Sequence, residues 1–140
     1  MSTRSAIVLS NKDGVQIIYC HHDGYIEHNG RILNKHYNTR QAVQELVDLG
    51  DISVLGESID TCIAYHRDEG EDYEYTAARL YSNHYQMLKE EFEGSDYEYL
   101  YIFLQTGKWA VISSKDAATK GTCLLNDEIA MLNRSEFRLV

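Results

Sequence analysis

The chain has 140 residues, of which 44% are hydrophobic and 25% charged. This is the composition of an ordinary folded protein, and we expect a single domain over residues 1–140. Its 13 basic and 22 acidic residues give a formal net charge of −9, and the absence of a Lys/Arg cluster disfavours direct nucleic-acid binding. No apolar run is long enough for a membrane span or a secretory leader, so we expect a cytoplasmic protein without a membrane partner.

The chain opens with a predicted β-hairpin over about residues 5–20. Residues 6–9 and 15–20 are apolar and rich in β-branched side chains, and Asp13-Gly14 lies between them. An Asp-Gly pair between two such runs is a strong hairpin signal. The polar segment Tyr-Cys-His-His-Asp-Gly-Tyr, residues 19–25, then follows where the second strand leaves the sheet.

Two short helices are predicted next. Residues 29–37 have helical spacing. The second helix begins at the capping residues Asn38-Thr39, with Gln41 in capping-box position after Asn38, and Gly50 follows as its stop. Residues 51–57 are predicted to form an ordered loop, residues 61–65 a strand, and residues 67–74 a charged loop.

The second half is predicted to contain the longest helix and a second hairpin. Apolar residues recur at helical spacing over residues 77–92, and Gly94 follows as the stop. Residues 97–113 form a hairpin around Gln105-Thr106-Gly107, with Tyr97, Tyr99, Tyr101 and Phe103 expected on one face. One helical turn is expected near residues 126–132. We therefore predict an α+β fold, with an antiparallel sheet of about five strands built from the two hairpins and the strand at 61–65, and three helices packed on it.

Several motifs together resemble a family of small bacteriophage and prophage proteins. The matching segments are Met-Ser-Thr-Arg at 1–4, the polar segment at 19–25, Gly-Asp-Ile-Ser-Val-Leu-Gly-Glu at 50–57, Tyr-His-Arg-Asp-Glu-Gly-Glu at 65–71, and Tyr-Glu-Tyr-Leu-Tyr with Gly-Lys-Trp at 97–101 and 107–109. The family pattern at the second segment is Tyr-x-His-Trp-Asp-Gly-Tyr-Pro, so His22 and Ile26 depart from it. The resemblance implies a viral or prophage origin, with no established activity.

A small polar pocket is one functional hypothesis. His21 and Asp23 are two residues apart, so their side chains share a face of an extended chain. If the loop at 67–71 folds beside them, Asp68 and Glu71 would add carboxylates, and Arg4 or Arg67 could hold an anion. The four candidate catalytic residues would then serve a small hydrolase or a pocket that sequesters a ligand.

The competing interpretation of these residues is structural. Asp23-Gly24 would cap a turn, and the loop at 67–71 would be a solvated, salt-bridged surface. Two candidate ligands do not complete a metal site, and Cys20, Cys62 and Cys123 form no CxxC pair, so we expect no metal and no cofactor. The cysteines are expected to be reduced structural thiols.

The leading hypothesis is a protein that binds, and thereby inhibits, a host protein of defence or nucleic-acid handling. Eleven tyrosines stand against three phenylalanines, and ten of the acidic residues fall between residues 68 and 98. An acidic, tyrosine-rich surface suits a basic groove on a partner. Self-association through an edge strand or a tyrosine face is a further expectation. The expected contact residues are Arg4, His22, Tyr25, Arg67, Tyr73, Glu90, Glu91 and Glu93.

Overall fold

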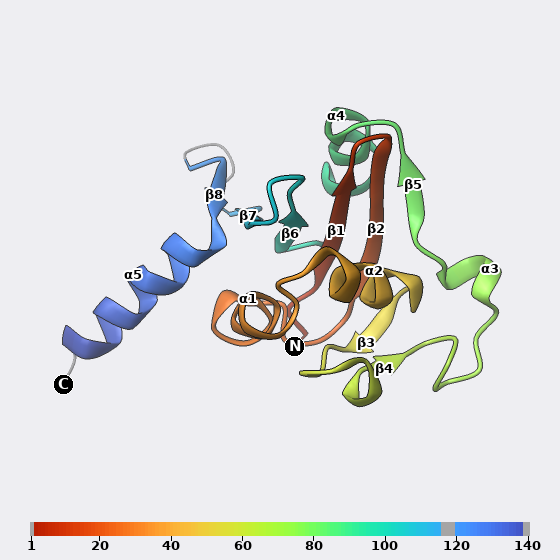
Figure 1. The fold of residues 1–140 in the computed structure, drawn as a ribbon, viewed down its shortest axis with the longest axis horizontal. Coiled ribbons are helices and arrows are strands. Elements are labelled where there is room, and N and C mark those ends of the chain that lie inside the picture. The colour runs from red at the N-terminus through yellow and green to blue at the C-terminus, as the bar shows by residue number, and fades with distance from the viewer. Residues whose placement is uncertain (1, 116–119, 139–140) are drawn as a thin grey trace.

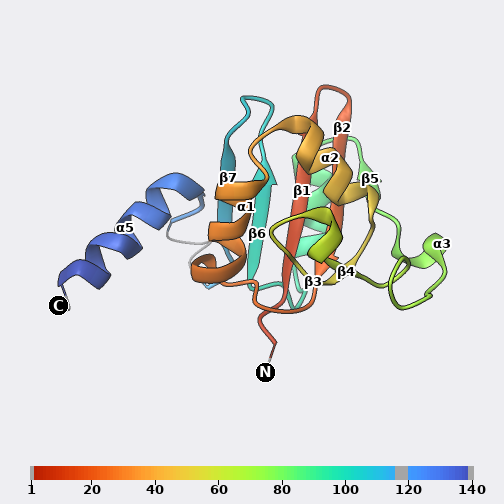
Figure 2. The ribbon, with the colours of Figure 1, turned by 60° about the horizontal axis from the view of Figure 1, so that its bottom comes forward.

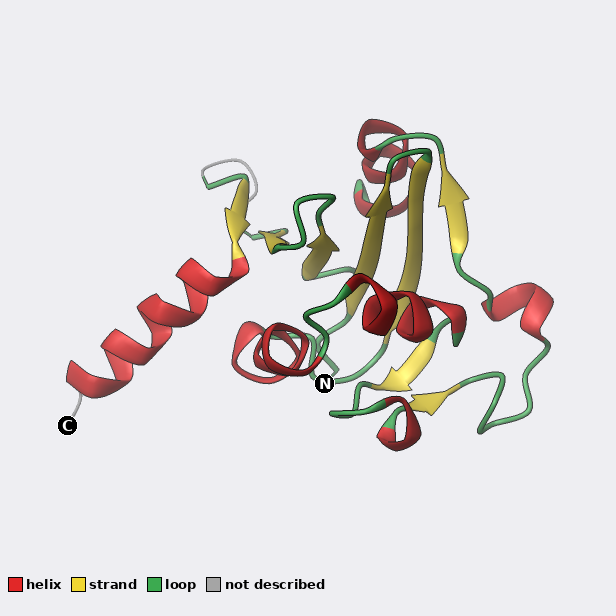
Figure 3. Cartoon of the chain, in the orientation of Figure 1, coloured by secondary structure: helices red, strands yellow, loops and turns green. Residues whose placement is uncertain are grey.

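The computed structural model describes residues 2–115 and 120–138, which form an α+β fold around one mixed sheet (Figures 1 and 3). The strands are β1 (Ser5–Asn11), β2 (Gly14–Cys20), β3 (Ile52–Val54), β4 (Ile63–Ala64), β5 (Arg79–Tyr81), β6 (Tyr99–Phe103), β7 (Trp109–Ser113) and β8 (Thr122–Leu124). Their order in the 8-stranded sheet is β4-β3-β2-β1-β6-β7-β8, and β5 also pairs with β2. No helix in the described ranges is long and apolar enough to span a membrane.

The two predicted hairpins are present, but the sheet is not purely antiparallel. β1 and β2 pair from Ser5↔Cys20 to Asn11↔Gly14, and β6 and β7 form the second hairpin. β1 also pairs with β6 in parallel, and β2 pairs with β3 in parallel. Because β1 lies at the centre of the sheet and is buried on both faces, it takes a partner from far along the chain.

Helices cover one face of the sheet densely (Figure 2). A π-helical turn (Ile26–Gly30), α1 (Arg31–His36) and α2 (Arg40–Asp48) place Leu33 and Leu46 against the sheet. Of the two predicted capping residues, Thr39 is the N-cap, because its side chain accepts a hydrogen bond from the Ala42 amide. α5 (Leu125–Arg138) is much longer than the predicted single turn. Leu125 and Ile129 in its first half pack against the core, and the helix then extends away from the other elements.

The opposite face is covered by a smaller unit. α4 (His84–Met87) continues into a π-helical segment, Leu88–Phe92, and Met87, Leu88 and Phe92 pack against this side of the sheet. α3 (Tyr73–Thr76) lies beyond the core, next to β5, at the rim of the molecule. The described residues form five α-helices where three were predicted, and two of the five have only four residues.

Three of the predicted elements differ in detail from the structure. The helix expected over residues 77–92 is interrupted, because residues 79–81 join the sheet as β5 and Asn83 caps a new helix by accepting from the Gln86 amide. The loop at 51–57 contributes β3, and the strand at 61–65 is reduced to a 3-10 turn, Ile59–Thr61, and the two residues of β4. Tyr97 precedes β6 and packs with the second core, whereas Tyr101 lies in the first.

Candidate functional site

The polar segment at residues 19–25 forms a turn that backbone hydrogen bonds stabilise. The amides of His21 and His22 donate to the carbonyls of Ile52 and Ser53 at 3.1 and 3.0 Å, which extends the pairing of β2 with β3. Asp23 then adopts a φ of 58°, a left-handed conformation that Asp tolerates better than most residues. The turn therefore explains why Asp23 occurs at this position.

Buried polar groups hold this turn from inside. The Asn29 side chain, 1% exposed, donates to the His22 carbonyl at 3.0 Å and to the Cys20 thiol at 3.3 Å. The buried Tyr101 hydroxyl donates to the Gly24 carbonyl at 2.6 Å. A Cβ on Gly24 would lie 2.7 Å from the Thr3 carbonyl oxygen, so only glycine fits there. Most of the segment that carries the phage-family resemblance is thus structural.

The side chains of His21 and His22 are not part of this bracing: His22 reaches Ser2 in the segment before β1, and His21 bonds to Tyr19 on β2. The Tyr19 hydroxyl hydrogen-bonds to His21 Nδ1, and the two imidazole rings meet edge to face with centroids 4.5 Å apart. Ser2 Oγ lies 3.0 Å from His22 Nδ1. Arg4 hydrogen-bonds to the Tyr19 side chain and pairs with Asp96 at 3.6 Å. Burial, and then the charges of His22 and Arg4, lower the pKa of His21 below 6.5.

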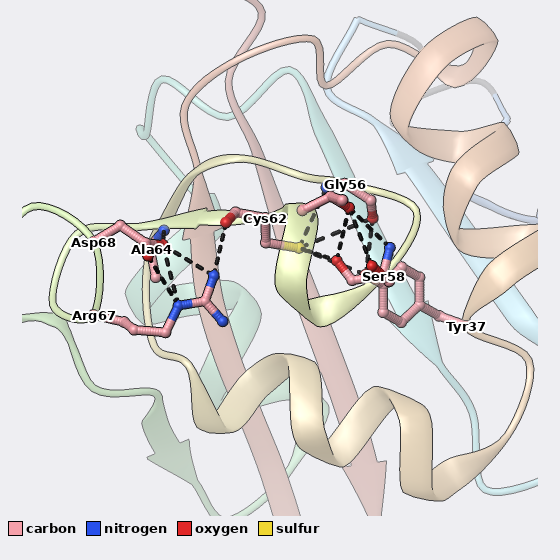
Figure 4. A network of polar contacts seen from close by, with 8 residues as sticks. Tyr37, Gly56, Ser58, Cys62, Ala64, Arg67 and Asp68 are labelled. Atoms are coloured by element: carbon pink, nitrogen blue, oxygen red, sulfur yellow. Dashed lines mark hydrogen bonds and ion pairs between the residues drawn. The ribbon is translucent and has the colours of Figure 1, made fainter.

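The loop at 67–71 is held by its own contacts (Figure 4). The Arg67 guanidinium donates to the Cys62 carbonyl at 2.7 Å and pairs with Asp68 at 3.0 Å. Asp68 also accepts from the Ala64 amide at 2.7 Å, and these hydrogen bonds, first from Arg67, lower its pKa. Both residues therefore stabilise the turn after β4.

The Cys62 thiol anchors the preceding segment, residues 56–58 (Figure 4). Its buried thiol accepts from the Gly56 amide at 3.3 Å and donates to the Ser58 carbonyl at 3.4 Å. The Tyr37 hydroxyl donates to the Gly56 carbonyl at 2.8 Å. A thiol in such a buried setting is a structural group.

Two of the four candidate catalytic residues of the pocket hypothesis, Asp68 and Glu71, are held by contacts within their own segment. Asp68 is engaged by Arg67 and Ala64, and the backbone of Glu71 bonds to Tyr65 and His66. The charges of Glu69 and Glu71, with that of Tyr19, add to the effect of burial in raising the pKa of Tyr65. Across residues 2–115 and 120–138, no three His, Cys, Asp or Glu side chains are grouped so that they could hold a metal ion.

An ion-pair network that the sequence did not reveal ties β5 to its neighbours. Arg79 donates to Asp51 at 2.8 Å and to Glu91 at 3.1 Å, and all three side chains are largely buried. Asp51 also accepts from the Tyr19 amide at 2.8 Å. The carboxylates hold the pKa of Arg79 above its usual value in spite of its burial. Asp51 and Glu91 are 28 and 12 residues from Arg79 in the chain, so no local sequence motif predicts these ion pairs.

Glu91 is the centre of a tyrosine cluster. It accepts from the Tyr81 hydroxyl at 2.6 Å and from Tyr97 at 3.3 Å, and burial with this hydrogen bond raises the pKa of Tyr81 to about 12. Glu90 and Glu93, in contrast, are exposed. Of the three expected contact acids in this segment, Glu91 is a structural group with 12% of its side chain exposed. A pocket of about 470 Å³ opens beside it, lined by Arg4, Tyr19, Glu90, Glu91, Ser95, Asp96 and Tyr97.

The outer edge of the sheet exposes large apolar side chains. Tyr75 on α3, Leu80 on β5 and Tyr85 on α4 are 79%, 73% and 75% exposed, and the three elements follow one another along this edge (Figure 1). We call these three residues the edge patch. Tyr73, expected to be a contact, is 40% exposed, and its hydroxyl donates to the Asp48 carbonyl. Tyr25 is half-buried, with its ring 6.0 Å from that of His28.

Comparison with known proteins found no match for this chain among protein-family models, curated proteins or solved structures.

Proposed function

We propose that this protein binds another protein, one that presents a basic surface, through the edge patch and the acidic residues beside it. The observation that carries the proposal is the exposure of Tyr75, Leu80 and Tyr85 on three consecutive elements. Large apolar side chains that remain in water on neighbouring elements mark an interaction surface more often than isolated ones do. The resemblance to phage proteins supports a host protein as the partner.

The residue types fit such a role. Tyrosine combines a large apolar ring with a polar hydroxyl, and few torsions become fixed when it is covered, so it is favoured in protein interfaces. Leu80 lies between the two tyrosines in the chain, on an edge strand that pairs with β2 on one side. A partner that covers these residues removes apolar area from water without having to displace a folded element.

The charged residues beside the patch favour a partner whose surface is positively charged. Glu69, Glu71 and Glu74 are exposed in the segment that leads into Tyr75, and no ion pair engages their side chains among the described residues. Unpaired carboxylates steer a basic surface toward the patch and repel an acidic one. Host proteins that handle nucleic acid carry such basic grooves, and occupying one would inhibit them.

The test uses the purified protein as bait for host lysate. The variant Tyr75→Ser, Leu80→Ser, Tyr85→Ser removes the edge patch without touching a buried residue. We expect loss of the captured partner by at least about tenfold, because each anchor residue contributes about 1 kcal/mol or more. The matched control is Met131→Ser, which alters an apolar side chain that is 48% exposed on α5.

A charge-reversal arm tests the electrostatic half of the proposal. Glu69→Lys, Glu71→Lys, Glu74→Lys should weaken capture, and raising the salt concentration should weaken capture by the unaltered protein. Equal capture by the edge-patch variant and the Met131→Ser control would refute the proposed surface. Capture that is insensitive to both salt and charge reversal would refute the basic character of the partner.

A further inference from the structure

The segment before β1 and the exit of β2 bring a serine and a histidine together. Ser2 Oγ and His22 Nδ1 are 3.0 Å apart, which is the distance at which an imidazole can take a proton from a hydroxyl. Both residues are half-buried. Their separation of 20 residues in the chain makes this a tertiary contact, created by the pairing of β1 with β2.

The imidazole is held in place by several contacts. The His22 amide donates to the Ser53 carbonyl, and the His22 carbonyl accepts from the buried Asn29 side chain. The ring packs edge to face against His21, which is fixed in turn by the Tyr19 hydroxyl. A base with a fixed backbone and a packed ring needs little rearrangement before proton transfer.

Ser2 also opens into a pocket. A cavity of about 300 Å³ is lined by Ser2, Thr3, Arg4, Asp96 and Glu98, so a serine and an arginine border the same space. Arg4 could donate to an oxygen on which negative charge develops. Asp96 and Glu98 also line the pocket, and their carboxylates disfavour an anionic substrate and accept a neutral or cationic one.

We propose that Ser2 and His22 are the nucleophile and general base of a hydrolase for small carboxylic esters that are uncharged or cationic. Ser2 Oγ adds to the carbonyl carbon while its proton passes to His22 Nδ1, and the carbonyl oxygen takes up negative charge near Arg4. The bond to the leaving oxygen then breaks, and the alcohol departs with the proton from His22. Water attacks the acyl-serine, His22 accepts the water proton and returns it to Ser2 Oγ, and the acid is released.

The experiment uses p-nitrophenyl acetate, an activated ester small enough for the pocket. We expect p-nitrophenolate release with an acetyl group on Ser2 that mass spectrometry detects after rapid acid quench. Ser2→Ala and His22→Gln should each lower the rate by about 10²-fold or more. His66→Gln, which alters an exposed histidine that bonds only to a backbone carbonyl in the described ranges, is the control for hydrolysis by surface imidazoles.

The outcomes separate cleanly. An acetyl group on Ser2 together with loss of the rate in both site variants, but not in His66→Gln, supports the pair. Absence of the adduct, or an unchanged rate in folded Ser2→Ala as judged by circular dichroism, overturns it. The proposal is independent of the edge patch, so capture experiments with host lysate succeed or fail without bearing on it.

Discussion

At the scale of the residue, the polar segment at 19–25 divides into backbone and side-chain roles. Asp23 and Gly24 are required by the turn, because one takes a left-handed backbone and the other touches the Thr3 carbonyl. His21 and His22 are bound through their backbones, which leaves their imidazoles to meet Ser2, Tyr19 and each other. A chemical role therefore rests on the two histidines and not on Asp23.

The surroundings of His21 make its titration a direct probe of this cluster. Burial, His22 and Arg4 lower its pKa, so its contribution to stability is fully present above 6.5 and is lost as the pH falls through the lowered folded value. We expect an NMR titration midpoint below 6.5 for His21. Arg4→Gln removes a nearby positive charge and should raise the midpoint toward 6.5. Lys12→Gln, at the far turn of the β1–β2 hairpin, should leave it unchanged. A wild-type midpoint at or above 6.5 would contradict the packing described for this ring.

At the scale of the element, the short helix α4 with its π-helical continuation is the main cover of the second sheet face. Met87 is fully buried there against the side chains of the sheet. We expect Met87→Ala to lower the free energy of unfolding by about 2–5 kcal/mol, since it leaves a cavity in the smaller core. Met131→Ala, at an exposed position of α5, should change it by less than about 0.5 kcal/mol. Denaturant unfolding measures the free energy of unfolding of both variants. If Met87→Ala changes it as little as Met131→Ala does, α4 does not cover a packed core on this face.

The same segment shows where sequence reasoning fails. Local signals are enough for the hairpin around Asp13-Gly14 and for the helix capped by Thr39, because turn chemistry and a cap act within a few residues. The helical spacing over residues 77–92 was misleading, since Leu80 and Tyr85 belong to an exposed surface and not to a core stripe. Residues 79–81 form a strand and not a helix, and the ion pairs of Arg79 with Asp51 and Glu91 help to hold them in the sheet.

The candidate sites were predictable only in part, for the same reason. The sequence pointed to His21 and Asp23 as catalytic candidates in this segment, to His22 only as a contact residue, and to acidic and tyrosine-rich character in the second half. It did not show that Ser2 is the neighbour of His22, because that contact depends on the register of β1 with β2. Nor did it show that Glu91 is buried while Glu90 and Glu93 are exposed, since the π-helical segment changes which side chains face inward.

At the scale of the whole molecule, acidic charge and exposed apolar side chains occur in the same stretch of the chain. Nine of the ten acidic residues between 68 and 98 are exposed, and Arg79 is already paired within the fold. The edge patch lies within the same stretch, on elements that line the outer edge of the sheet. Such an arrangement is costly for an isolated molecule, because like charges repel and the apolar side chains remain hydrated. A basic partner would relieve both costs at once.

This repulsion predicts that salt stabilises the unbound protein. Raising the ionic strength from about 0.01 M to about 0.15 M shortens the screening length from about 30 Å to about 8 Å, so repulsion among exposed carboxylates weakens. The melting temperature should therefore rise with salt. Neutralising Glu71→Gln, Glu74→Gln, Glu93→Gln should shrink the rise, whereas Lys12→Gln, Lys35→Gln, Lys89→Gln, which removes exposed positive charges, should enlarge it. Thermal melts at the two ionic strengths measure all three proteins. A melting temperature that falls with salt would mean that attractive surface ion pairs dominate. Repulsion among the acidic residues would then not destabilise the unbound protein, and a basic partner would have no such repulsion to relieve.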